Sequence, residues 1–152
     1  MEKEKQYQLL VEQVRSLAEG EDDAISVMAN MSAAIHEAMG FWWTGFYIER
    51  DGMLRLGPFQ GPVACYRIPH GRGVCGTAYE RRETVIVPDV EQFPGHIACS
   101  SLSRSEIVVP VFSEAHEVVA VLDIDSRDLA TFDATDQTYL EAICALITPI
   151  CK

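Results

Sequence analysis

The sequence predicts an α+β fold in which helices from the two chain ends cover a mainly antiparallel sheet. Apolar residues recur at helical spacing near both ends of the chain, and the middle holds runs of β-branched and aromatic residues. Two of these runs flank a two-residue turn signal. No linker and no internal repeat divides the 152 residues, so residues 1–152 are expected to form a single domain.

Two helices are predicted at the N-terminal end. Apolar residues at helical spacing run through residues 3–18, and Gly20 follows as a stop signal. A second, more buried helix begins after the carboxylates of residues 21–23, which favour a helix N-terminus, and ends at Gly40.

A β-hairpin is predicted next. Residues 41–48 are aromatic and β-branched, residues 51–52 are an Asp-Gly turn signal, and residues 53–56 form the partner strand. Residues 57–72 are rich in proline and glycine, so we expect an irregular functional loop with a short strand around residues 67–68.

The rest of the chain alternates short elements with loops. A short helix is expected at residues 73–81, and residues 91–104 are expected to be loop or short helix. Three further strands are predicted at residues 84–87, 107–112 and 118–124. A last helix, capped by Thr131 or Asp133, runs to Pro149.

The charge of the chain excludes two classes of partner. Twelve Lys and Arg residues against 23 Asp and Glu residues give a net charge of −11. Such a protein repels phosphate backbones and anionic lipid. The N-terminus leads into no apolar signal-peptide region, and no run approaches the roughly 18 apolar residues that span a bilayer. We therefore expect a cytoplasmic protein that binds neither nucleic acid nor membranes.

The cysteine count favours free or catalytic thiols. Five cysteines are present, at positions 65, 75, 99, 144 and 151. An odd number in a reducing compartment argues against a disulfide framework, and the lack of a Cys-x-x-Cys pair argues against structural zinc. Cys144 is expected to be a small core residue of the last helix, and Cys151 a thiol at its frayed end.

The other three cysteines lie in the loop-rich middle, where residues are often held for function. Cys75 falls near the start of a helix, whose dipole favours a thiolate. Cys99 precedes two serines and lies near His96 and Arg104, so that either Cys75 or Cys99 suits a nucleophile. Nothing local activates Cys65, but its loop suits a resolving thiol that must move to its partner.

Three carboxylates are expected at neighbouring strand ends. Asp123 and Asp125 are two residues apart on one strand and share a face, and Glu106 begins the preceding strand. If those strands pair antiparallel, the three groups meet, where they can hold an ammonium group or raise one carboxyl pKa for proton donation. The alternative is that they are solvated strand ends and turn caps.

An aromatic wall is predicted on the first strand. Trp43 and Tyr47 share a face and suit a methyl-sulfur group, whereas Trp42 is expected to point the other way. The alternative is that these rings are core. Histidines 70, 96 and 116 lack metal-ligand spacing and are expected to be hydrogen-bonded loop residues, so no metal site is expected.

Seven segments together resemble a known family. They are residues 56–61 (LGPFQG), 65–68 (CYRI), 71–78 (GRGVCGTA), 87–90 (VPDV), 93–101 (FPGHIACSS), 103–110 (SRSEIVVP) and 121–126 (VLDIDS). These segments look like those of the free methionine (R)-sulfoxide reductases, which are single GAF domains. The resemblance runs from about Gly40 to the final helix and includes all three cysteines of that family. It implies a GAF fold, with a six-stranded antiparallel sheet, helices on one side and a ligand pocket roofed by loops on the other.

The resemblance also implies an activity: reduction of free L-methionine (R)-S-oxide, with thioredoxin as reductant, NADPH as the indirect electron source, and no metal or organic cofactor. We predict that Cys99 attacks, that Cys65 resolves by forming a disulfide with Cys99, and that Cys75 is an auxiliary thiol. The three carboxylates would bind the substrate ammonium and assist protonation. GAF domains of this type often pair through their terminal helices, so a homodimer is also expected.

Two other functions remain open on the sequence. One is a non-catalytic GAF module that senses a small ligand such as a nucleotide or an amino acid, although such modules usually adjoin an output domain and do not require three loop cysteines. The other is a thiol-peroxidase-like enzyme. Thioredoxin-coupled NADPH consumption with methionine sulfoxide, peroxide or no substrate separates all three.

Overall fold

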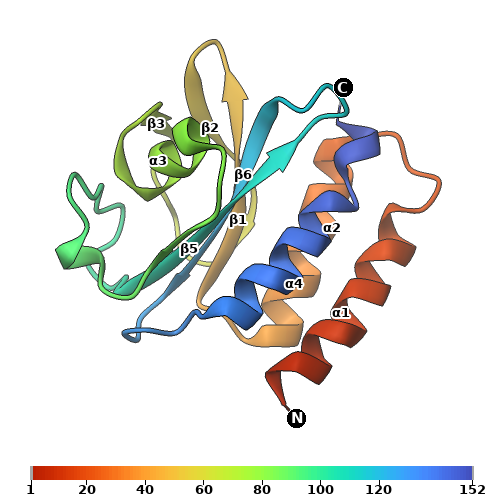
Figure 1. Ribbon diagram of the computed structural model, residues 1–152, viewed down its shortest axis with the longest axis horizontal. Coiled ribbons are helices and arrows are strands. Elements are labelled where there is room, and N and C mark those ends of the chain that lie inside the picture. The colour runs from red at the N-terminus through yellow and green to blue at the C-terminus, as the bar shows by residue number, and fades with distance from the viewer. Residues whose placement is uncertain (1, 152) are drawn as a thin grey trace.

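The computed structural model describes residues 2–151 and contains a six-stranded antiparallel sheet with the spatial order β3-β2-β1-β6-β5-β4 (Figure 1). Every neighbouring pair of strands is antiparallel. The strands are β1 (Trp43–Arg50), β2 (Met53–Gln60), β3 (Arg67–Pro69), β4 (Val85–Val87), β5 (Ser105–Phe112) and β6 (Val118–Ser126). The predicted α+β class and six-stranded antiparallel sheet are confirmed.

The helices from the two chain ends lie on one face of this sheet, and loops with one short helix cover the other (Figure 1). The helices are α1 (Lys3–Ala18), α2 (Ala24–Met39), α3 (Gly73–Arg81) and α4 (Ala134–Ala145). α2 contacts β1 and β2, α4 contacts β5, and α1 packs on α2 and α4. α3 lies on the opposite face with the loops of the chain's middle. Within residues 2–151, no helix is both long and apolar enough to cross a membrane.

The helix ends follow from local side-chain chemistry. The Asp23 side chain accepts hydrogen bonds from two backbone N–H groups in the first turn of α2, and Gly40 ends that helix in the left-handed conformation at a φ of 69°. Asp133, rather than Thr131, caps α4 through a reciprocal capping box with Asp136. These caps satisfy backbone groups that the helices leave unpaired.

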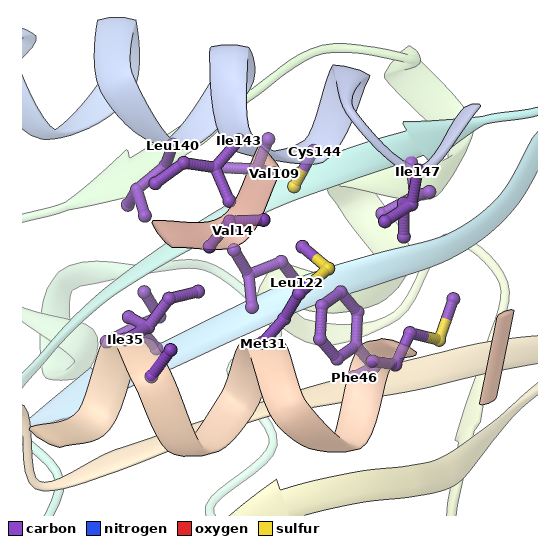
Figure 2. Close-up of a cluster of buried hydrophobic side chains, with 14 of the residues drawn as sticks. Val14, Met31, Ile35, Phe46, Val109, Leu122, Leu140, Ile143, Cys144 and Ile147 are labelled. Atoms are coloured by element: carbon purple, nitrogen blue, oxygen red, sulfur yellow. The ribbon is translucent and has the colours of Figure 1, made fainter. Parts of the chain in front are cut away.

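The core between sheet and helices arises from strand alternation. Phe46 of β1, Val109 of β5 and Leu122 of β6 point toward the helices, where they meet Met31 of α2 and Ile143 of α4 (Figure 2). All five side chains are buried. Burying such a side chain stabilises the fold by about 1.5–3 kcal/mol relative to exposure. The neighbouring residues on each strand consequently face the loop side.

A buried polar network joins the two chain ends. Asp136 on α4 is fully buried and accepts hydrogen bonds from the Tyr7 hydroxyl, at 2.5 Å, and the Lys3 ammonium, at 2.6 Å. Because both donors lie on α1, Asp136 fixes α1 against α4, which would otherwise be joined only by apolar contacts and weaker surface bonds.

The predicted irregular loop at residues 57–72 begins too early. Residues 57–60 continue β2, and Phe59 and Gln60 pair with Gly45 and Thr44 of β1. A Cβ atom at Gly45 would lie 2.3 Å from the Phe59 Cβ, so glycine at this position permits the close pairing. The short strand around residues 67–68 is confirmed as β3.

The prediction for Cys151 is wrong, whereas Cys144 is a buried core residue as expected. Cys151 is only 5% exposed and belongs to the core between helices and sheet. The reason is the 3-10 turn Thr148–Ile150, after which the Cys151 N–H donates to the Ile147 carbonyl and turns the chain end inward.

Candidate active site

Strand register places three carboxyl groups together on the loop face of the sheet. Glu106 on β5 lies directly opposite Asp125 on β6, and Asp123 lies two residues along the same face of β6. Glu106 is 6% exposed and Asp123 is 5% exposed, whereas Asp125 is partly exposed. The predicted meeting of the three groups is confirmed, and two of them are buried rather than solvated strand ends.

The aromatic wall stands beside these carboxyl groups. Trp43 on β1 pairs with Asp125, and the rings of Trp43 and Tyr47 stack with centroids 6.1 Å apart. Both rings also hold the loop above them. The Trp43 indole Nε1 donates to the Pro62 carbonyl and the Tyr47 hydroxyl donates to the Cys65 carbonyl, each at 2.9 Å. The wall therefore positions the segment that carries Cys65.

Loops and wall enclose a pocket with a cavity of about 50 Å³. The wall and the carboxyl groups form one side of it, and Cys75, Cys99 and His96 line it from α3 and the β4–β5 loop. Among the described residues, neither Lys nor Arg lines this pocket. The predicted ligand pocket roofed by loops is thus present, and the charged groups that it offers are acidic.

A disulfide joins Cys65 and Cys99 across the two loops. Their Cα atoms are 5.4 Å apart, although 34 residues separate them in the chain. This pairing confirms the predicted disulfide. Cys99 is solvent-exposed and also lines the pocket, whereas Cys65 is half-buried.

The pKa values of the three carboxyl groups are raised. Burial raises the pKa of Glu106 well above its usual range, and the negative charge of Asp123 adds to the effect. Burial followed by the charge of Asp123 does the same for the pKa of Asp125. Burial also raises the pKa of Asp123, but its contacts with the neighbouring Glu106 and Asp125 carboxyl groups oppose that rise. The pKa of Asp123 is raised less than those of Glu106 and Asp125, so Asp123 is the member that most readily carries the negative charge and the other two are the better proton donors.

The expectation that a helix dipole favours the Cys75 thiolate is wrong. Cys75 lies in the first turn of α3, but it is only 2% exposed. Burial, followed by the nearby negative charge of Asp123, raises the pKa of this thiol well above its usual range. Desolvation and like charge thus outweigh the dipole of a nine-residue helix.

Two polar side chains of the β4–β5 loop complete the site. The Ser103 hydroxyl donates to Asp125 Oδ1 at 3.3 Å, and His96 Nε2 lies 3.8 Å from Glu106 Oε1. Burial lowers the pKa of His96 and raises that of Glu106, so both shifts favour the neutral forms of this pair. His96 is thus a pocket residue rather than only a hydrogen-bonded loop residue, and its position three residues before Cys99 is the sequence signal for that placement.

The first strand also differs from the prediction. Trp42 lines the same pocket as Trp43, because β1 begins only at Trp43 and strand alternation does not extend to the residue before it. Gly45 is a site residue that sequence reasoning missed. A Cβ atom there would lie 2.7 Å from the Trp43 ring, so glycine lets the wall lie flat on the sheet.

The fold and this pocket define a GAF domain, and the GAF domain family model matches residues 21–150. GAF domain-containing protein A of Dictyostelium discoideum is 51% identical over 95% of this chain and 92% of its own length. The free methionine-R-sulfoxide reductase of Saccharomyces cerevisiae is 40% identical over 99% of this chain and 88% of its own.

A solved structure agrees with these relatives. The free methionine-R-sulfoxide reductase of Neisseria meningitidis, in complex with its substrate, is 47% identical with a TM-score of 0.94, covering 97% of this chain and 89% of that one. The chain belongs to the free methionine-R-sulfoxide reductase family of GAF domain proteins. The predicted resemblance is confirmed.

Proposed function

We propose that this protein reduces free methionine (R)-sulfoxide to methionine, with Cys99 as nucleophile, Cys65 as resolving thiol and Cys75 as auxiliary thiol. The observation that carries the proposal is the Cys65–Cys99 disulfide beside a pocket that holds buried carboxyl groups. A thiol-dependent reductase reaches such a disulfide at the end of each turnover. The proposal agrees with the activity for which the yeast and Neisseria relatives are named.

The substrate would bind as a zwitterion. Its ammonium group would lie against Asp123, with Glu106 and Asp125 beside it, because the pocket offers acidic groups and its described lining includes neither Lys nor Arg. Its S-methyl group would lie against Trp43 and Tyr47, since sulfur and methyl groups pack well on aromatic rings. Its carboxylate would accept hydrogen bonds from backbone N–H groups of the loops.

The reaction would proceed in two balanced steps. The Cys99 thiolate attacks the sulfoxide sulfur while Glu106 or Asp125, whose pKa values are raised, donates a proton to the oxygen. An S–O bond to the Cys99 sulfur then forms as the substrate S–O bond and the transient bond between the two sulfurs break, so methionine leaves and Cys99 becomes a sulfenic acid. The Cys65 thiol then attacks the Cys99 sulfur, forms the disulfide and releases water. Two electrons thus pass from the two thiols to the sulfoxide.

The disulfide then needs a dithiol reductant. We propose thioredoxin for this role, with NADPH as the indirect electron source and the cytoplasm as the compartment. The exposure of Cys99 supports the proposal, because a partner's thiolate can approach it from solvent. A homodimer is a further proposal, supported by the exposed apolar side chains of Leu9 on α1 and Ile25 on α2.

The test is NADPH consumption in the presence of thioredoxin and thioredoxin reductase. Free methionine (R)-sulfoxide should drive turnover, and the Cys99→Ser variant should abolish it. Cys144→Ala serves as the matched control, because Cys144 is a buried thiol in the core between the helices and the sheet, away from the pocket. Peroxide-driven turnover of similar efficiency would instead identify a thiol peroxidase.

A ligand-sensing module is the second outcome of this test. Such a module would bind methionine sulfoxide or another small ligand without producing methionine. The same samples should therefore be analysed for methionine by chromatography, and binding without product would refute the proposed reaction.

A further inference from the structure

Three side chains from distant parts of the chain direct donor atoms to one point in the pocket. The Cys75 sulfur and one carboxylate oxygen each from Glu106 and Asp123 all lie within 4.8 Å of one another. Cys75 comes from α3, Glu106 from β5 and Asp123 from β6. All three are nearly completely buried. A thiolate with carboxylates is a donor set that Zn²⁺ accepts.

The distances suit one small cation. Zn–S bonds of about 2.3 Å and Zn–O bonds of about 2.0–2.2 Å place tetrahedral ligand atoms roughly 3.4–3.6 Å apart. The donor atoms of this cluster lie within 4.8 Å, so small side-chain rotations bring them to that separation. His96 lies beside Glu106, with 3.8 Å between Nε2 and Oε1, so its imidazole is a further nitrogen donor next to the cluster.

An independent observation indicates that a cationic ligand belongs here. Asp123 Oδ1 is buried and has no hydrogen-bond partner among the described residues. Leaving a buried carboxylate oxygen unpaired is costly unless a ligand satisfies it. Neither Lys nor Arg lines the described pocket, so neither supplies the positive partner of this oxygen.

We propose that this pocket also binds one thiophilic divalent cation, with Zn²⁺ as the best fit, through Cys75, Glu106 and Asp123. The thiol selects against Mg²⁺ and Ca²⁺, which require oxygen ligands. The cation would occupy the position of the substrate ammonium, so the metal excludes methionine sulfoxide; this competition rests on the function proposed above. The metal binding itself does not depend on that function. Sequence spacing gave no sign of this site, because its ligands are separated by 31 and 17 residues.

The test uses Co²⁺ as a spectroscopic probe on the oxidised protein. The Cys65–Cys99 disulfide then removes those two sulfurs, which leaves Cys75 as the pocket thiol. We expect a saturable thiolate-to-cobalt charge-transfer band with one ion per chain, which Zn²⁺ displaces and millimolar Mg²⁺ does not. The Cys75→Ser variant should lack the band, and the Glu106→Gln variant should bind Co²⁺ at least tenfold more weakly. The Cys144→Ala variant should retain it.

Each other outcome has a defined meaning. The absence of a saturable band in the wild-type protein, or its persistence in Cys75→Ser, overturns the metal site. Circular dichroism of each variant checks its fold, and Glu106→Gln provides a second test if Cys75→Ser does not fold. Free methionine sulfoxide should weaken the band in the reduced protein. If the band forms normally, but free methionine sulfoxide neither weakens it nor is reduced by the protein, the metal site stands and the proposed function fails.

Discussion

Removing the ammonium group of the substrate should damage turnover far more than removing its carboxylate. The pocket supplies three carboxyl groups within one sheet face, with Glu106 and Asp123 at 6% and 5% exposure. It supplies neither Lys nor Arg among its described lining residues. The substrate carboxylate consequently depends on backbone N–H groups, whereas the ammonium has charged partners.

The magnitude follows from the contacts available. An ammonium between Asp123 and a second carboxyl group makes two hydrogen bonds involving charged groups, each worth about 1.5–3 kcal/mol. Their loss is about 3–6 kcal/mol, or roughly a 10²- to 10⁴-fold fall in kcat/KM. Loss of the neutral N–H bonds to the carboxylate should cost about 0.5–1.5 kcal/mol each.

The assay compares three substrates at equal concentration: free methionine (R)-sulfoxide, its N-acetyl derivative and its C-terminal amide. The first derivative lacks the ammonium and the second lacks the carboxylate charge. We expect the N-acetyl compound to be the poorer substrate. The Asp123→Asn variant should narrow the gap between the free and N-acetyl compounds, because it removes the charged partner. Equal kcat/KM values for the free and N-acetyl compounds would refute the reasoning.

Four further results are expected. In single turnover without reductant, Cys99→Ser should yield no methionine, and a full yield would refute its role as nucleophile. The Asp125→Asn and Glu106→Gln variants should each lower kcat by about 10²- to 10⁴-fold if these groups supply the proton, and wild-type rates in both would mean that they do not. Burial, then the charge of Asp123, raises the pKa of Glu106, so its contribution to stability is complete below its ordinary pKa and is lost as the pH rises through the raised value. As the pH rises above the ordinary glutamate pKa of about 4.3, denaturant unfolding should therefore show the free energy of unfolding of Glu106→Gln increasing relative to that of the wild type, and a constant difference would contradict this. Asp136→Ala leaves the buried Tyr7 hydroxyl unpaired and weakens the α4 cap, so it should lower the free energy of unfolding by about 2–4 kcal/mol without changing turnover, a prediction that fails if the loss is below 0.5 kcal/mol.

Local patterns in the sequence determined most of the secondary structure. The helical apolar spacing located α1, the carboxylates before α2 and Gly40 after it set that helix, and the Asp-Gly turn set the β1–β2 hairpin. Each of these signals acts within a few residues, so it can be read without the fold. The resemblance of seven segments to the free methionine (R)-sulfoxide reductases predicted the family and the three loop cysteines.

The tertiary structure decided what those residues experience. The pKa of Cys75 rises rather than falls, because folding buries it beside Asp123, a residue 48 positions away in the chain. The end of β2 depended on how closely Phe59 can approach Gly45, and the position of Cys151 depended on the final turn. Burial and through-space charge are properties of packed surfaces between distant segments, so periodicity and local composition could identify these residues but could not assign their protonation or their ligands.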